Sequence, residues 1–336
     1  MLHSDHPSST DKIEISVVVP VLNEEDSIRV LIEDLLKQTL KPAAIVITDG
    51  GSTDRTRAII EEFIASGAPV KLVCVTQSMP GRARNLAAQE VRTDWIAFTD
   101  AGITLAPDWL EQLVTRVKEK TADVVYGTYD PIIESFFTEC AAIAYVPPPF
   151  ESDGGPVRPR SIVSALMRRD AWEKVNGFPE HLRSAEDLLF MNNVERAGFV
   201  IARTSRARAR WHIQPNLSRT FRRFVEYSRN NIRAGLFRQW QGTIFIYYAL
   251  IAATTLAVLV LGLRGLLAPL VVWLLLLTAR AARTLYRNRV NYPASLARNL
   301  ARLALLVPII ATLDAAAFIG SINWLLRDKL RLMGSN

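Results

Sequence analysis

The most constraining feature of the sequence is a run of 21 residues, 243–263, without a charged side chain. Such a run is long enough to cross the hydrocarbon core of a bilayer as a helix. A second apolar run begins after Arg264, and the two predict a helical hairpin over residues 243–263 and 265–282. The chain therefore divides into a polar part, up to about residue 240, and a membrane domain over residues 243–336.

A third apolar run, residues 303–326, is interrupted by Pro308 and Asp314. If it crossed the bilayer, the basic residues that follow it would lie on the outer side, against the usual distribution of positive charge. We therefore expect an interfacial or re-entrant helix here rather than a third span.

Basic residues flank the hairpin on both sides. Arg233 and Arg238 precede it, and Arg280, Arg283 and Arg287 come at its end. Positive charge at both ends places both ends in the cytoplasm, which predicts a multi-pass protein of the cell membrane with a cytoplasmic polar part. The net charge of +7 comes without zinc-ligand spacing or a recognition helix, so membrane lipids are expected partners and nucleic acid is not.

Arginines alternate with aromatic residues over residues 214–242. This pattern predicts a basic amphipathic helix at the membrane surface, with its aromatic side chains inward and its arginines toward lipid phosphates. A solvated helix, or one whose arginines hold the phosphates of a ligand, is the alternative. Residues 1–12 are polar and predict a disordered tail.

The region over residues 13–213 alternates short apolar runs with amphipathic segments. The β-branched or bulky runs are too short for helices and predict strands, and the strand before Asn23 is expected to end at Pro20. Strands that alternate with helices through short connections form a mostly parallel, doubly wound sheet. The expected strands are residues 15–20, 44–47, 70–75 and 95–99, and the helices between them begin near residues 28, 55 and 81.

Acidic residues follow three of these strands: Glu24, Asp49 and Asp100. Ligands of open α/β sheets bind at the carboxyl ends of the strands, so the acids are expected at one edge. Arg82 and Arg84 lie at a helix start between them and are suited to phosphates. Each group also has a plain interpretation, as a turn or as a solvated helix face. No G-x-G-x-x-G follows the first strand, which argues against a dinucleotide site.

Five segments together resemble the family 2 glycosyltransferases of the GT-A fold. The resemblance covers roughly residues 15–230, and its segments are VVVPVLNEE from residue 17, ITDGGSTDRT from 47, GRARN from 81, WIAFTDAG from 95, and NGFPE followed by SAED up to 187. It implies a GT-A domain over residues 13–213, with a mostly parallel sheet flanked by helices and followed by membrane helices. It also implies a UDP- or GDP-linked sugar donor, a divalent cation (Mn²⁺ or Mg²⁺) and inversion at the anomeric carbon.

The resemblance assigns roles to individual positions. Asp49 would meet the nucleotide base, and Asp100 would be the acid on the metal side. The arginines of GRARN, Arg82 and Arg84, would lie near the diphosphate. The positions that would line the base and ribose are Pro20, Leu22 and Glu24.

One departure from the family pattern concerns the metal. The family usually ends the strand with Asp-x-Asp, whereas this chain has Asp100-Ala101-Gly102. Mg²⁺ or Mn²⁺ can be held by one or two carboxylates together with phosphate oxygens and water, so another group helps or metal dependence is relaxed. His212 is the candidate helper, and a structural histidine beside Trp211 is the alternative.

The candidate catalytic residues are Glu186 and Asp187, expected in the first turn of a helix that Ser184 could cap. Acids also suit a helix start for electrostatic reasons alone. In the functional interpretation, Asp187 deprotonates an acceptor hydroxyl, which attacks the anomeric carbon in a single displacement. A phosphate acceptor would need no base, so the pair favours a hydroxyl of a glycolipid or an envelope glycan.

Three alternatives remain open from the sequence. A catalytically weak sugar-nucleotide-binding membrane protein would explain the missing second aspartate. A polyprenyl-phosphate glycosyltransferase would share the donor site. A nucleotidyltransferase would carry a Gly-rich basic loop after the first strand, where this chain has residues 20–25. The sugar, the nucleotide, the acceptor, the linkage and the oligomeric state stay undetermined.

Overall fold

The computed structural model describes residues 13–260 and 267–329. The chain forms two compact units. The sheet unit consists of the chain up to Asp130 together with Pro149–His212, and the helical unit consists of Pro131–Pro148 together with the chain from Ile213 onward. The expected tail over residues 1–12 lies outside the described residues.

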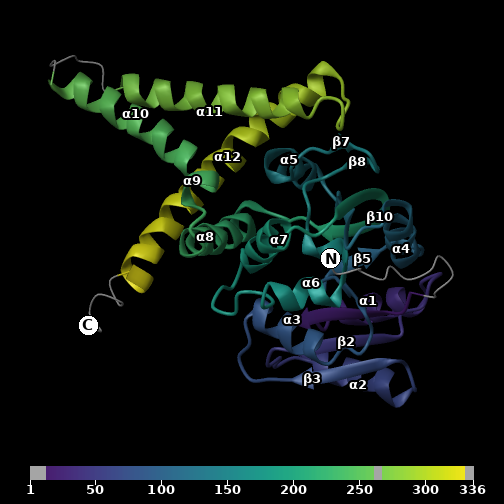
Figure 1. Cartoon of the computed structure of the whole chain (residues 1–336). Coiled ribbons are helices and arrows are strands. Elements are labelled where there is room, and N and C mark those ends of the chain that lie inside the picture. Colours follow the sequence, from purple (N-terminus) through teal and green to yellow (C-terminus); the bar gives the residue numbers. More distant parts are fainter. Residues whose placement is uncertain (1–12, 261–266, 330–336) are drawn as a thin grey trace. The chain divides into compact units, whose positions relative to one another are not determined.

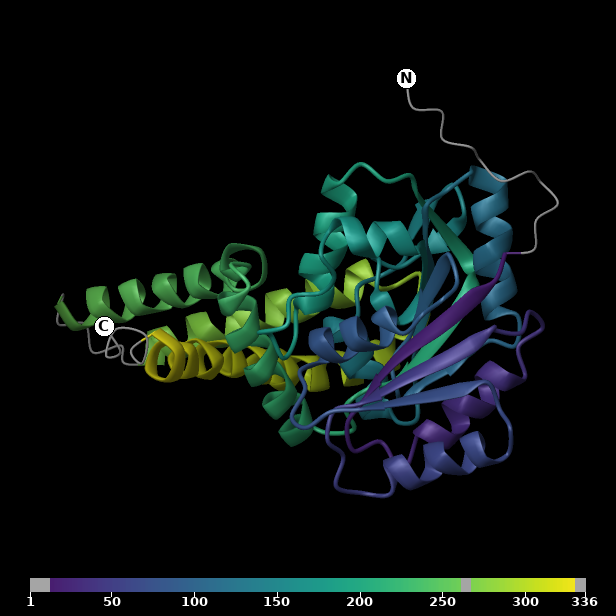
Figure 2. The same ribbon diagram turned by 60° about the horizontal axis from the view of Figure 1, so that its bottom comes forward.

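The sheet unit is built on an eight-stranded sheet with the order β3-β2-β1-β4-β9-β6-β10-β5 (Figures 1 and 2). Its first four strands along the chain pair in parallel, as the strand–helix alternation predicts. Their bounds are β1 Ile15–Val21, β2 Ala44–Asp49, β3 Val70–Cys74 and β4 Trp95–Phe98.

The other half of the sheet brings in antiparallel strands. β9 (Ala165–Arg168) pairs antiparallel with both β4 and β6 (Val124–Ile132). β10 (Ile201–His212) pairs antiparallel with the short β5 (Ile103–Leu105). The α/β fold class is confirmed, and the later strands extend the sheet on the far side of β4.

The two faces of the sheet carry separate cores because successive strand residues point to opposite sides. Val17 and Val19 of β1 belong to one apolar cluster, which includes residues of α1 (Ile28–Leu36), α2 (Thr56–Ala65) and α4 (Trp109–Lys120). Val18 belongs to the other, which includes residues of α3 (Pro80–Gln89), α6 (Arg169–Lys174) and α7 (Glu186–Arg196). β1 is therefore buried on both faces, as its continuous apolar run requires.

Two local expectations were wrong. β1 does not end at Pro20 but runs to Val21. β1 pairs with β4 as far as Val18 and with β2 as far as Val21, and a strand with one open edge tolerates a residue that lacks an N–H. Residues 150–159 are rich in Gly and Pro, which predicts a loop, but they contain a hairpin, β7 (Phe150–Ser152) with β8 (Gly155–Val157).

Among its described residues, the helical unit has three helices that are long and apolar enough to cross a membrane: α10, α11 and α12 with its extension to Lys329. The junction near Arg264 lies outside the described residues, and α11 continues five residues past the expected end at residue 282. The helices of this unit are α5 Phe136–Tyr145, α8 Leu217–Arg233, α9 Phe237–Trp240, α10 Gly242–Val260, α11 Leu267–Arg287 and α12 Leu296–Trp324 (Figure 1).

α12 is continuous through Pro308. Asp314, which in the sequence counted against a third membrane span, is fully buried, and its two oxygens accept hydrogen bonds from Arg280 of α11 at 2.5 and 2.8 Å. A bidentate arginine compensates much of the desolvation of a carboxylate. An acid in this run is therefore compatible with an apolar helix.

The second half of α12 packs along α8. A Cβ added to Gly320 would lie 2.5 Å from Cβ of Ser228, so only glycine permits this approach. Ser228 Oγ donates a hydrogen bond to the carbonyl of Ala317 at 2.9 Å, and Arg229 forms a bidentate ion pair with Asp328. The arginines at positions 219, 222 and 223 of α8 are exposed. α8 thus has one packed face and one basic face.

Candidate active site

Asp100 lies where the sequence predicts, two residues past the end of β4. The turn that follows it passes through Gly102, whose φ of +76° favours glycine, and enters β5. The side chain of Asp100 is 30% exposed, which leaves it partly open to a ligand. The carboxylate is thus delivered at the carboxyl end of a central strand.

Arg84 of α3 joins Asp100 to Glu186. Its Nη2 donates to Asp100 Oδ1 at 2.6 Å and its Nη1 donates to Glu186 Oε1 at 2.7 Å, and the side chains of Arg84 and Glu186 are almost completely buried. The guanidinium also lies over the ring of Phe178, 5.4 Å from its centroid. One arginine therefore holds together acids that lie far apart in the sequence.

The start of α3 is fitted closely to the loop before α7. A Cβ on Gly81 would lie 2.2 Å from the carbonyl oxygen of Pro179. The side chain of Asn85 uses its full hydrogen-bonding capacity in the same contact: its oxygen accepts from Trp172 Nε1 and from the Phe178 amide, and its nitrogen donates to the Phe178 carbonyl and to Glu180. Most of the GRARN segment thus builds the site, while Arg82 is exposed and available to a ligand.

Glu186 and Asp187 begin α7, as predicted, but Ser184 does not cap the helix. The residue before the helix, Ala185, has φ of +69°, outside the extended conformation that side-chain capping requires. The hydroxyl of Ser184 is buried and has no hydrogen-bond partner among the described residues. A non-glycine residue in the left-handed region is strained, and such strain is concentrated at functional sites.

The electrostatics of the site favour a carboxylate that binds a proton more readily than usual. Burial raises the pKa of Glu186; Arg84 opposes this and Asp187 adds to it. Burial also raises the pKa of Asp187, against Arg84 and together with Asp100. Although burial alone would lower the pKa of Arg84, the acids around it raise that pKa, so it stays charged. A carboxylate with a raised pKa is suited to accept a proton near neutral pH.

The loops after β1 and β2 are tied together where the nucleotide is expected. Asn23 donates its amide to Ser52 Oγ and accepts the amide of Thr53, both at 2.8 Å. The Glu24 amide donates to Thr56 Oγ1 at 2.7 Å. Leu22 is 40% exposed beside this network, and Pro20 pairs with Thr48 inside the sheet. The fold thus gathers the predicted base- and ribose-lining residues at one edge.

Asp49 is completely buried at the end of β2. Its Oδ1 accepts the amide of Ser52 at 3.0 Å, and its Oδ2 accepts from Arg57 Nη2 at 3.3 Å. Arg57, in the first turn of α2, was not singled out from the sequence, where it reads as one more basic residue on a helix. Its pairing with Asp49 makes it part of the candidate nucleotide site.

The chain's own ligands for a divalent cation are few. A Cβ on Gly102 would lie 3.9 Å from Glu24 Oε2. Trp211 pairs with Ile103 in antiparallel register, so the next residue of β10, His212, continues toward Gly102. The described residues contain no group of three or more His, Cys, Asp or Glu side chains that could hold a metal. This donor set fits a cation that takes most of its oxygens from a diphosphate and water.

Comparison with known proteins agrees with this geometry. The model of the family "Glycosyl transferase family 2" matches residues 16–175. The succinoglycan biosynthesis protein ExoA of Rhizobium meliloti is 28% identical over 244 residues, which cover 69% of this chain and 72% of that protein. The pre-mycofactocin glycosyltransferase of Mycobacterium tuberculosis is 26% identical over 197 residues, 55% of this chain, and the match spans 40% of its length.

The fold has a solved counterpart. The mannosyltransferase PcManGT of Pyrobaculum calidifontis, solved with GDP-Man and Mn²⁺, superposes with a TM-score of 0.55 at 18% identity, over 95% of this chain and 89% of that one. At this identity the likeness shows a shared fold. The chain is therefore similar to the family 2 glycosyltransferases over residues 16–175, and it has the GT-A fold.

Proposed function

We propose that the chain transfers a sugar, with inversion, from a UDP- or GDP-linked donor to a hydroxyl of a glycolipid or an envelope glycan. The observation that supports this best is the bridge made by Arg84. It joins Asp100, the acid on the donor side, to Glu186, the neighbour of the proposed base Asp187. A transferase needs both halves within reach of one sugar ring.

In the proposed reaction Asp187 accepts the proton of the acceptor hydroxyl. The oxygen forms a bond to the anomeric carbon from the face opposite the nucleotide, and the bond from that carbon to the diphosphate breaks. Arg84 acts as a positioning residue because the acids occupy both ends of its guanidinium. Exposed Arg82 is the arginine that meets the diphosphate. Asp100 is the residue that would hold a divalent cation, which would supply charge neutralisation for the leaving nucleotide.

The acceptor is inferred from the base and from one relative. A phosphate oxygen is already ionised and needs no base, whereas a hydroxyl does. The name of ExoA refers to the biosynthesis of succinoglycan, and that protein is similar to this chain over most of both lengths. These observations support a glycan or glycolipid hydroxyl over a polyprenyl phosphate.

The same proposal assigns the parts of the chain to the membrane. Residues 13–213 form the cytoplasmic GT-A domain, residues 214–242 the basic interfacial helix, and residues 243–336 the membrane domain. α10 and α11 form the hairpin with both ends in the cytoplasm. Because α12 packs along polar α8 through Ser228 and Gly320, the second half of α12 lies at the interface with it.

The test is nucleotide release from UDP-, GDP- and dTDP-sugars by the full chain in detergent, with and without lipid extract from the cell envelope, and with Mn²⁺, Mg²⁺ or EDTA. We expect release from one donor that depends on the extract, and a product with inverted anomeric configuration by NMR. Tight binding of a donor without release in any arm would support the sugar-nucleotide-binding alternative.

A further inference from the structure

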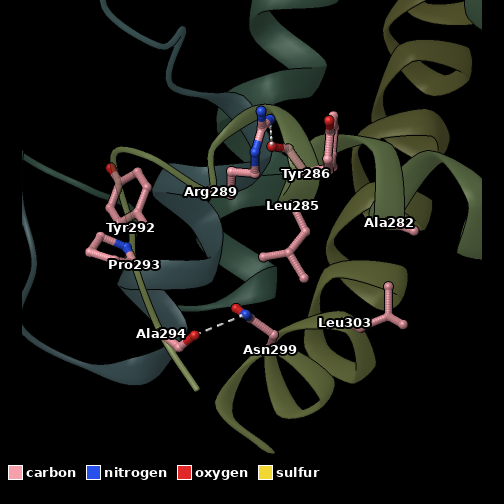
Figure 3. A pocket seen from close by; sticks show the side chains of 9 residues that line it. All are labelled: Ala282, Leu285, Tyr286, Arg289, Tyr292, Pro293, Ala294, Asn299 and Leu303. Atoms are coloured by element: carbon pink, nitrogen blue, oxygen red, sulfur yellow. Dashed lines mark hydrogen bonds between the residues drawn. The ribbon is translucent and has the colours of Figure 1, made fainter. Parts of the chain in front are cut away.

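A cavity of about 520 Å³ lies in the helical unit where α11 ends and α12 begins (Figure 3). Its apolar wall comes from Ala282, Leu285 and Leu303 on the two helices. Tyr286, Arg289 and Tyr292 line it from the last turn of α11 and from the connection to α12. None of these residues belongs to the sheet unit.

The connection that forms one wall is fixed by a buried arginine. Arg302 of α12 is 3% exposed, and its Nη1 donates to the carbonyl of Tyr292 at 2.8 Å and to Asn299 Oδ1 at 2.9 Å. Its Nε donates to Glu139 of α5 at 2.7 Å. Asn299 in turn donates to the carbonyl of Ala294 at 3.3 Å (Figure 3). These hydrogen bonds fix the wall of the cavity in the absence of a ligand.

The cavity lining contains one charged side chain, that of Arg289. Arg289 donates from Nη1 to the carbonyl of Tyr286 at 2.9 Å, and its guanidinium lies 3.9 Å from the centroid of the Tyr286 ring (Figure 3). These contacts hold the charge in place and leave further N–H groups for a ligand, since a guanidinium has five.

The surface around the cavity is suited to lipid. Large apolar side chains near it are exposed, among them Val290 (79%), Leu296 (76%) and Leu300 (58%). Together with the exposed apolar face of α11, they would be unfavourable in water and favourable in a bilayer. Tyrosines such as Tyr286 and Tyr292 are typical of the level of the lipid headgroups.

The charge of the region is one-sided. Residues 280–302 contain six arginines and no acidic residue. Asp314 pairs with Arg280, and Glu139 pairs with Arg298 and Arg302. Within the described part of the chain, no ion pair with an acid is found for the arginines at positions 283, 287 and 289. This excess favours an anionic ligand.

We propose that this cavity binds the phosphate-bearing end of a bilayer phospholipid, with its first chain carbons against Leu285 and Leu303 and its phosphate on Arg289. The volume is within the range of ligand sites that bury most of a small molecule. The site concerns the membrane domain alone and is independent of which sugar the sheet unit transfers.

The test uses the full chain in detergent and native mass spectrometry with phosphatidylglycerol and with diacylglycerol of the same chains. We expect phosphatidylglycerol to be retained preferentially. Ala282→Phe fills the cavity from an exposed position and should abolish retention of both lipids. Arg289→Gln should weaken retention of phosphatidylglycerol about fivefold and leave diacylglycerol unchanged. Inorganic phosphate should not displace the lipid, because it lacks the chain contacts.

Arg283→Gln is the matched control, since Arg283 is an exposed arginine on α11 outside the cavity lining. It should leave retention unchanged. An equal loss in Arg283→Gln and Arg289→Gln would assign binding to the general basic surface and overturn the proposal. Unchanged retention in Ala282→Phe would overturn it as well, and so would full displacement by inorganic phosphate.

Discussion

The candidate active site and the helical unit differ in how they compensate buried charge. At the candidate active site one buried arginine, Arg84, contacts both Asp100 and Glu186 and is also near Asp187 in electrostatic terms, whereas elsewhere in the sheet unit the buried Asp49 pairs with Arg57. In the helical unit each buried acid has at least one arginine of its own: Asp314 has Arg280, and Glu139 has two arginines. The acids around Arg84 therefore carry more negative charge than the arginine neutralises, whereas the charges of Asp314 and Glu139 are fully compensated.

The ratio of acids to arginines distinguishes a site that can bind a ligand from a pair that only stabilises the fold. Buried acids that outnumber their cations raise one another's pKa values, and such arrangements are found at functional sites. Buried acids that are matched by bidentate arginines are satisfied and have no need of a ligand. The comparison therefore predicts that changes among the acids of the sheet unit alter chemistry, whereas changes at the Arg280–Asp314 pair alter stability.

The largest expected effect is at Asp187. Asp187→Asn removes the proton acceptor and should lower transfer by a factor of about 10²–10⁴, while donor binding by calorimetry stays the same. The matched control is Glu195→Gln, which changes an exposed acid of the same helix and should retain activity. Full activity in Asp187→Asn would show that another group accepts the proton.

The pair in the helical unit should behave as structure. Arg280→Gln leaves Asp314 buried without its cation and should destabilise the helical unit by about 3 kcal/mol, measured as earlier unfolding in detergent. Replacing both residues by leucine should recover most of that loss, with normal activity per folded molecule. A double variant that folds but cannot transfer sugar would contradict the claim that this pair acts on stability alone.

Gly81 tests the fit between α3 and the loop before α7. Gly81→Ala places a methyl group 2.2 Å from the carbonyl of Pro179, which should cost about 1–3 kcal/mol in the free energy of unfolding and shift Arg84 away from its acids. Thermal unfolding together with kcat measures both effects. Gly242→Ala is the control, because a Cβ there meets no atom within 4 Å and the residue, like Gly81, has no positive φ. A Gly81→Ala variant with the stability and kcat of the unchanged chain would refute the close fit.

The smallest expected effect concerns the acid that the family pattern has and this chain lacks. Gly102→Asp should strengthen Mn²⁺ binding only a few-fold, roughly, because one more carboxylate adds to a cation held mainly by substrate and because Glu24 is near. The signal of free Mn²⁺ in electron paramagnetic resonance measures this. Gly102→Asn imposes the same backbone conformation without the charge and should not strengthen binding; equal strengthening by both variants would exclude a role for charge.

The parts that the sequence predicts well are those with a local pattern. A short, continuous apolar run such as residues 95–98 predicts a strand, because it is too short for a helix and suits a strand that is buried on both faces. Parallel pairing of the strands then brings Asp49 and Asp100 to one edge of the sheet. The long uncharged run from residue 243 predicts an apolar helix for the same reason, and α10 confirms it.

What the sequence does not predict depends on contacts between distant segments. Arg84 and Glu186 are 102 positions apart, and no periodicity shows that an arginine near a helix start will be buried between acids. The pairing of Arg280 with Asp314 also joins distant segments. Without knowledge of that pair, the sequence counts Asp314 against a membrane-spanning helix. The left-handed conformation of Ala185, which prevents capping by Ser184, is one that alanine rarely adopts, so the residue type gives no sign of it.

The central claim is that Arg84 joins the donor-side and acceptor-side acids into one catalytic site. Its most direct test is the pH dependence of sugar transfer in Arg84→Lys and Arg84→Met. Arg84 lowers the pKa of Asp187 against the effect of burial. Its loss should therefore raise that pKa and move the acidic limb of the profile to higher pH, further in Arg84→Met than in Arg84→Lys. A uniform loss of rate at every pH, with the limb unmoved, would contradict the claim.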